Sequence, residues 1–260
     1  MPHRPDGASG CPAHAIADLT LGTVPGWGPP AVLEMLDVIQ STAAPFPCTF
    51  AVSAARKRSL RFAFCDGFDE DALAPLPGLL TAYLDGHRDL GRDTSFVVLF
   101  PDEPEDRALG GYRELFWAIL DRLHAADDRP WPADVPLDPD DPRWEFCFHG
   151  EPIFVVCNTP AHEARRSRHS PGFVVTFQPR WVFEGIEAHT RQGQAARKVI
   201  RRRLAAYDAV APSPALGDYG APGNREWKQY FLDDGDGGDD RTDGDGVCPF
   251  GTARARGRSS

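Results

Sequence analysis

The stretch WEFCFHGEPIFVVC, residues 144–157, determines the fold class of this chain. Two short apolar segments, Trp144–Phe148 and Ile153–Cys157, flank the tetrapeptide His149-Gly150-Glu151-Pro152. Apolar segments of this length are typical of strands, and a short connection that contains glycine joins antiparallel neighbours. The sequence therefore predicts a β-hairpin in the central part of a sheet.

On both sides of this hairpin, strand-like and helix-like segments alternate. Further strands are predicted at 60–65, 94–100 and 172–177, and helices at 31–40, 77–88, 112–126, 179–189 and 194–207. The helices are predicted from apolar residues that recur at helical spacing. The order of elements follows neither a Rossmann repeat nor a barrel repeat. We therefore predict an α+β, or mixed α/β, single domain with a central, largely antiparallel sheet flanked by helices.

Composition separates the folded part of the 260 residues from polar segments. Residues 1–28 are rich in proline and glycine, so we expect poor order there, with the domain itself at 29–232. Residues 233–246 hold seven aspartates against one arginine, which is −6 of the net charge of −10. We expect a flexible loop there, because such a tract buries little apolar surface. The segment 247–250, which contains CPF, is expected to return to the domain, and 251–260 to form a disordered tail.

Whether the six cysteines are expected to form disulfides depends on the cell compartment in which the protein lies. The N-terminus has no apolar signal core, and no apolar run approaches the roughly 18 residues of a membrane span. We therefore expect a cytoplasmic protein without a membrane partner. Thiols in a reducing compartment are buried core groups, metal ligands or reactive groups rather than disulfides. No CxxC pair is present, which argues against a zinc ribbon or a thioredoxin-like site.

Several motifs are shared with one protein family. They are PFPCTFA (45–51), PWP (130–132), DPRWEFCFHGEPIFVV (141–156), RRSR (165–168), FQPRWVFE (177–184), EWKQYFL (226–232) and CPF (248–250). The chain resembles the YqcI/YcgG family in these motifs, over about residues 30–250. The FPC and CPF tripeptides are the marks by which that family is identified.

The resemblance implies an activity that composition and periodicity do not reveal. Family members of the guanitoxin and D-cycloserine pathway type are haem-dependent N-hydroxylases of guanidino groups. The resemblance thus implies haem b, a small substrate bearing a guanidino or amino group, and either peroxide or dioxygen with an electron donor. A haem-dependent monooxygenase is the resulting prediction. The alternative is a haem-binding or thiol-based sensor without turnover. The oligomeric state stays open, a homodimer included.

Three residues are candidates for the axial ligand of the haem iron, and the sequence leaves the choice between them open. Cys48 lies in a proline-rich turn between a predicted helix and a predicted strand, and Cys248 precedes Pro249. A thiolate ligand donates electron density to iron and favours O–O cleavage. His149, in the hairpin turn, is the best histidine candidate. Each has a plainer interpretation, since free cysteine is usually a buried apolar group and a turn histidine is usually exposed.

Other polar residues complete the predicted site. Propionates of haem, or a substrate carboxylate, could pair with an arginine, and Trp181 could stack on a planar group. The arginine candidates are Arg165, Arg166, Arg168 and Arg180. An RRSR run is more often a solvated surface, so Arg180, between Phe177 and Trp181, is the preferred one. For a carboxylate that accepts substrate N–H groups we choose Glu151 first, with Glu226 second and Glu145 as a further option.

The chain lacks the motifs that identify several other functional classes. The chain has no GxSxG, no P-loop GxxxxGK[ST] and no GxGxxG after a strand, which argues against common hydrolases and nucleotide-dependent enzymes. Its basic segment at 197–203 fits the polar face of an amphipathic helix, and an acidic chain does not favour a nucleic-acid partner.

Overall fold

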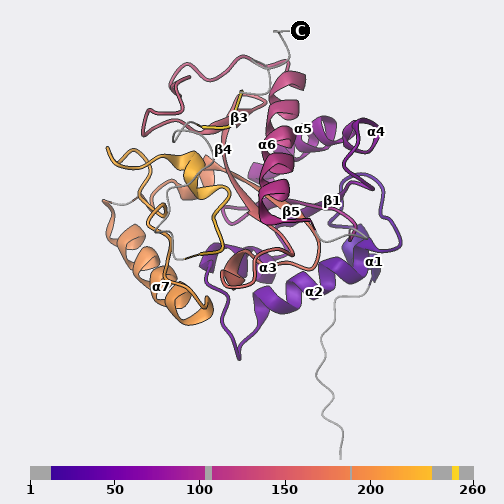
Figure 1. The fold of residues 1–260 in the computed structure, drawn as a ribbon. Coiled ribbons are helices and arrows are strands. Elements are labelled where there is room, and N and C mark those ends of the chain that lie inside the picture. The colour runs from indigo at the N-terminus through magenta and orange to yellow at the C-terminus, as the bar shows by residue number, and fades with distance from the viewer. Residues whose placement is uncertain (1–12, 103–106, 188, 236–247, 252–260) are drawn as a thin grey trace, which may run out of the picture.

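The computed structural model describes residues 13–102, 107–187, 189–235 and 248–251. Over these residues the chain forms one mixed α/β domain, a sheet flanked by helices, as predicted (Figure 1). The strands are β1 (Leu60–Phe64), β2 (Ser95–Leu99), β3 (Phe146–Phe148), β4 (Glu151–Asn158) and β5 (Val174–Pro179). The α-helices are α1 (Ala13–Ala17), α2 (Gly28–Gln40), α3 (Thr49–Lys57), α4 (Glu70–Leu73), α5 (Leu76–Gly86), α6 (Leu109–Ala126) and α7 (Arg191–Tyr207). Short 3₁₀ turns are η1 (His87–Leu90), η2 (Arg166–Arg168), η3 (Arg180–Phe183) and η4 (Glu226–Gln229).

The sheet has the strand order β1-β2-β5-β4-β3. β1 and β2 are parallel, and α4 and α5 form the crossover that a parallel pair requires. The other neighbouring strands are antiparallel. The prediction of a largely antiparallel sheet is therefore confirmed, and the 144–157 segment supplies its β3–β4 edge.

The hairpin turn is tighter than the sequence predicts. Only His149 and Gly150 lie between β3 and β4, and both have positive φ angles, 55° and 76°. Two left-handed residues give the turn whose twist matches that of the flanking strands. The backbone N–H of His149 donates to Asp127 Oδ2 at 2.9 Å, which holds this otherwise disfavoured conformation.

One predicted helix does not form, and the observed helix α3 was not predicted. The helix predicted at 179–189 does not form, because β5 continues through Pro179 and is followed only by η3. Gly185 then adopts a φ of 80°, which an α-helix excludes. Conversely, α3 occupies the region between Cys48 and β1, for which no helix was predicted. It ends at Arg58, a non-glycine residue in the left-handed conformation with a φ of 57°.

The ends of the domain also differ from the expected boundaries. Residues 13–28 belong to the fold, since the side chain of Ile16 is fully buried and Thr20 bridges Phe62. At the other end, Asp234 accepts hydrogen bonds from the backbone N–H groups of residues 163–165. The predicted disorder of 1–12, 236–246 and 252–260 concerns residues outside the described ranges. None of the described helices is both long and apolar enough to cross a membrane.

The two faces of the sheet are covered differently. One face packs against α4, α5 and α6 in the larger apolar cluster, which contains Ile153, Val155 and Phe177 (Figure 1). The other face is covered by α1, α2 and α3 near β1 and β2. Side chains alternate along a strand, so the neighbours of core residues point to this second face. In β4 and β5 those neighbours surround a cavity rather than a packed core.

Candidate functional site

The candidate site is a cavity of about 990 Å³ between the sheet and the helices α2, α3 and α7. This volume is at the upper end of the range of about 300–1,000 Å³ that is usual for small-molecule sites. Its wall is mostly apolar and includes Met35, Val38, Ile39, Phe46, Phe50, Val97, Phe154, Val156, Phe183, Ile200 and Leu204. The fold therefore provides room for a large, mainly apolar ligand.

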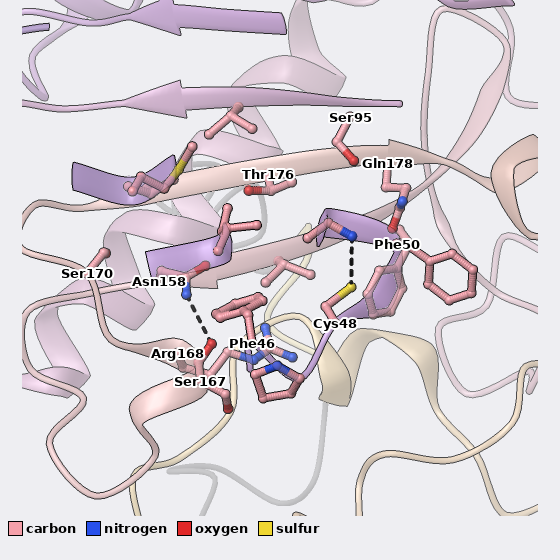
Figure 2. Close-up of a pocket in the computed structure, with 18 of the residues that line it drawn as sticks. Phe46, Cys48, Phe50, Ser95, Asn158, Ser167, Arg168, Ser170, Thr176 and Gln178 are labelled. Carbon is pink, nitrogen blue, oxygen red and sulfur yellow. Dashed lines mark hydrogen bonds between the residues drawn. The ribbon is translucent and has the colours of Figure 1, made fainter. Parts of the chain in front are cut away.

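Polar side chains of the sheet form one side of this cavity. Figure 2 shows Ser95, Thr176 and Gln178 projecting from β2 and β5 toward the space. Ser95 is 4% exposed and Gln178 is 9% exposed. Burying polar side chains costs free energy unless they find hydrogen-bond partners, so apolar side chains would suit these positions better if they served packing alone. These residues alternate with the core residues Phe96, Val175 and Phe177. The strands thus carry a polar strip that core packing does not require.

Cys48 is the cysteine on the cavity wall, opposite this strip (Figure 2). It is the N-cap residue of α3, and its Sγ accepts a hydrogen bond from the backbone N–H of Ala51 at 3.4 Å. Burial raises the pKa of the Cys48 thiol, whereas the helix amides and Arg168 act to lower it. Burial thus keeps the thiol protonated at neutral pH, although donors that can stabilise a thiolate lie beside it.

Arg168 lines the same side of the cavity as Cys48 and Phe46 (Figure 2). It is 8% exposed, and its Nη1 and Nη2 donate to the backbone carbonyls of Tyr230 and Gln229, at 3.4 and 3.0 Å. Burial lowers the pKa of this guanidinium to about 10. A cation that remains charged at neutral pH thus lies on an apolar cavity wall.

A network of buried charges borders the cavity at Arg180. Its guanidinium donates to Glu145 at 2.6 Å through both Nε and Nη2, and to Glu226 Oε1 at 2.7 Å. The ring of Tyr219 lies 3.7 Å from the guanidinium carbon, a cation–π contact. Burial raises the pKa of Glu145 to about 7, and the nearby carboxylate of Glu226 adds to this effect. Two carboxylates thus share one arginine.

The structure separates the three predicted ligand candidates. Cys248 is 4% exposed and belongs to the packed core on the other face of the sheet, and burial raises its pKa to about 12. His149 lies in the hairpin turn, where its Nε2 is 3.0 Å from Asp85. Neither residue lines the cavity, whereas Cys48 does.

The remaining predicted site residues divide in the same way. Arg165, Arg168, Arg180 and Glu226 line the cavity. Glu151 shares the core face of β4 with Ile153 and pairs with Arg88 at 3.2 Å, near the surface. The ring of Trp181 contacts His87, Arg88 and Arg92, away from the cavity. Arg166 is exposed, and its guanidinium lies over the ring of Tyr207.

Sequence reasoning missed several cavity residues. The sequence could have indicated Ser95, Thr176 and Gln178 as site residues, because each is a polar residue at a buried position of an otherwise apolar strand. Tyr219 lies outside the strands and helices, so no periodicity indicates it. The described residues contain no group of three His, Cys, Asp or Glu side chains placed to hold a metal ion together.

Fold and cavity define the class: a mixed α/β single-domain protein with one large, cysteine-lined ligand cavity among its described residues. The sequence places it further, since the model of the YqcI/YcgG family matches residues 35–251. The chain belongs to the YqcI/YcgG family.

Curated relatives extend over most of the chain. It is 46% identical to "Uncharacterized protein YcgG" of Bacillus subtilis (strain 168), over 81% of this chain and 85% of the relative. It is 43% identical to "Uncharacterized protein YqcI" of the same strain, over 82% and 85%. It is 36% identical to "Putative N(omega)-hydroxy-L-arginine synthase DcsA" of Streptomyces lavendulae, over 79% and 77%. No solved structure gives a significant match.

Proposed function

We propose that this protein is a haem-dependent enzyme that hydroxylates a nitrogen atom of a small guanidino compound. The observation that carries the proposal is the combination of the cavity, with Cys48 on its wall, and a 36% identical relative whose name specifies an N(omega)-hydroxy-L-arginine synthase. The relative supports the kind of reaction, and the cavity supports the kind of cofactor.

The chemistry of the cavity fits haem. Haem b is a flat apolar macrocycle that carries two propionates and needs an axial ligand from the protein. The cavity offers an apolar wall, a cysteine sulfur at Cys48 and the buried cation of Arg168. When bound, haem would supply the oxygen activation that a guanidine nitrogen requires.

Cys48 is the proposed axial ligand among the three candidates. It faces the cavity, whereas Cys248 and His149 do not. Its position as N-cap of α3 puts the Ala51 amide at the sulfur, and such donors, with the positive end of a helix, stabilise a thiolate. Coordination to iron would lower the pKa of the thiol, so the raised pKa of Cys48 does not oppose this role.

Glu226 is the proposed carboxylate for the substrate. It lines the cavity, and with Glu145 it forms a pair that Arg180 neutralises only in part when both are ionised. A guanidinium substrate is a cation and is attracted to such a site. With dioxygen, hydroxylation of one N–H consumes two electrons and two protons from a donor and releases water. With peroxide it releases water and needs no electron donor.

The test is a hemin titration of the purified chain. We expect a Soret band on binding that shifts when L-arginine or another guanidino compound is added, and an N-hydroxylated product in the presence of dioxygen with a reductant, or of peroxide. A chain that binds no hemin would refute the proposal. Hemin binding without any product would instead favour the haem-sensor alternative.

A further inference from the structure

Arg168 differs from the other two predicted arginines on the cavity wall in that no carboxylate forms an ion pair with it. Arg180 is paired with Glu145 and Glu226, and Arg165 lies 4.0 Å from Asp208 and donates to three backbone carbonyls. Arg166 is exposed and does not line the cavity. Among the described residues, Arg168 has no acidic side chain within 4.0 Å of its guanidinium. It is a buried charge without a direct ion pair, and the carboxylate of Asp208, which contacts Arg165, acts on it only from a longer distance.

The guanidinium of Arg168 lies on the cavity wall and has hydrogen-bond donors that no described group uses. Taking a charge out of water is costly, and proteins normally pair a buried charge. The two backbone carbonyls satisfy only one hydrogen on each Nη atom, which leaves further N–H donors of Arg168 available.

We propose that Arg168 is the carboxylate-binding residue of the cavity. A guanidinium fork matches a carboxylate geometrically, and one monoanion would balance the single buried charge. This inference rests on the proposed function, which supplies two carboxylates of the same chemistry: a propionate of haem and the α-carboxylate of an amino-acid substrate. It assigns to Arg168 a recognition role that the other three arginines do not share.

The competing explanation is structural, because Arg168 also holds the backbone of residues 229–230. The variant Arg168→Gln separates the two roles, since its amide can still donate to a carbonyl but has no charge. Arg166→Gln is the matched control, because it removes the same charge two residues away, outside the cavity. Thermal unfolding of each variant reports whether the fold is retained.

The experiment uses ligand pairs that differ in the carboxylate. Calorimetry compares L-arginine with agmatine, which lacks the α-carboxylate, and Soret titration compares hemin with hemin dimethyl ester, whose propionates are blocked. We expect wild type and Arg166→Gln to prefer the carboxylate-bearing member of one pair by about tenfold or more, as for a charge-assisted hydrogen bond. Arg168→Gln should reduce that preference to within about twofold. The pair affected identifies the source of the carboxylate.

Two results would overturn the inference while the proposed function stands. One is wild type that binds hemin and arginine without preference in either pair, and the other is Arg168→Gln with an undiminished preference. If wild type binds neither hemin nor arginine, both proposals fail together. Should Arg168→Gln not fold, Arg168→Lys decides, because a point charge without the fork should weaken the preference and an unchanged preference contradicts the inference.

Discussion

The two faces of the sheet show how one set of strands builds both a core and a site. On one face, Ile153, Val155, Val175 and Phe177 pack against α5 and α6 without exposed surface. On the other face, the strand residues between these core positions include Thr176 and Gln178. The helices on that face do not pack directly against them, and a cavity lies between. Close packing is the norm for protein interiors, so a space of this size beside a polar strip indicates a ligand site rather than imperfect packing. The two motif cysteines fall on different faces.

The cysteines provide the sharpest test of this comparison. We expect Cys48→Ala to weaken hemin binding at least about 100-fold, since even groups that only support a metal ligand contribute 10- to 100-fold. Cys248→Ala should keep hemin binding and lose about 1 kcal/mol of stability, as is usual for a core truncation. Soret spectra and denaturant unfolding of both variants decide. If Cys248→Ala lost hemin binding and Cys48→Ala kept it, the iron ligand would instead be Cys248, on the core face.

A pair of neighbouring strand residues tests the two faces directly. Phe177→Ala should lower the free energy of unfolding by about 3–5 kcal/mol, because it leaves a hole in a packed core. Thr176→Val, one residue away and facing the cavity, should change stability by no more than about 0.5 kcal/mol. Urea unfolding of the two variants measures both values. A large loss for Thr176→Val would mean that the Thr176 hydroxyl makes a hydrogen bond on which the fold itself depends.

The charge network gives a pH-dependent difference. The pKa of Glu145 is raised in the folded state to about 7, so between about pH 4.5 and 7 the folded chain binds more protons at this residue than the unfolded chain. Its contribution to stability therefore falls as pH rises through that window, by up to about 1.4 kcal/mol per pH unit. The variant Glu145→Gln should lack this contribution. Unfolding free energies of both proteins are measured at pH 5, 6 and 7. Wild type should lose stability relative to Glu145→Gln as the pH rises, and a difference that stays constant would contradict the assignment.

The smallest effect is expected at Glu151, on the core side of β4. Its ion pair with Arg88 is partly exposed, and such pairs contribute about 0–1 kcal/mol. Glu151→Gln should therefore leave stability within about 0.5 kcal/mol, and turnover within about twofold, of wild type. Glu226→Gln, which alters the cavity wall, is the comparison. If Glu151→Gln abolished turnover and Glu226→Gln did not, the cavity would not be the site of the reaction.

Much of the fold could be predicted because local patterns specify it. The apolar runs around 60–65, 94–100 and 172–177 each correspond to one strand, and 144–157 corresponds to the hairpin strands β3 and β4. The helices near 31–40, 77–88, 112–126 and 194–207 follow apolar spacing. The helix predicted at 179–189 failed because apolar spacing alone does not reveal that Pro179 ends a strand and that Gly185 takes a left-handed conformation. Local sequence predicts secondary structure poorly where pairing with a neighbouring strand decides how far a strand continues.

The site was less predictable than the fold, and Cys48 and Cys248 illustrate why. By itself the sequence determined the family through the FPC and CPF motifs, the mixed α/β class and the residue types at hand for haem and substrate. Only the tertiary structure decided that Cys48 caps a helix at the cavity while Cys248 fills a core. It also decided that, of the three predicted arginines on the cavity wall, Arg168 has no acidic side chain within 4.0 Å among the described residues. The reason is physical. The face on which a side chain lies depends on strand register and helix docking, and both are contacts between segments distant in sequence.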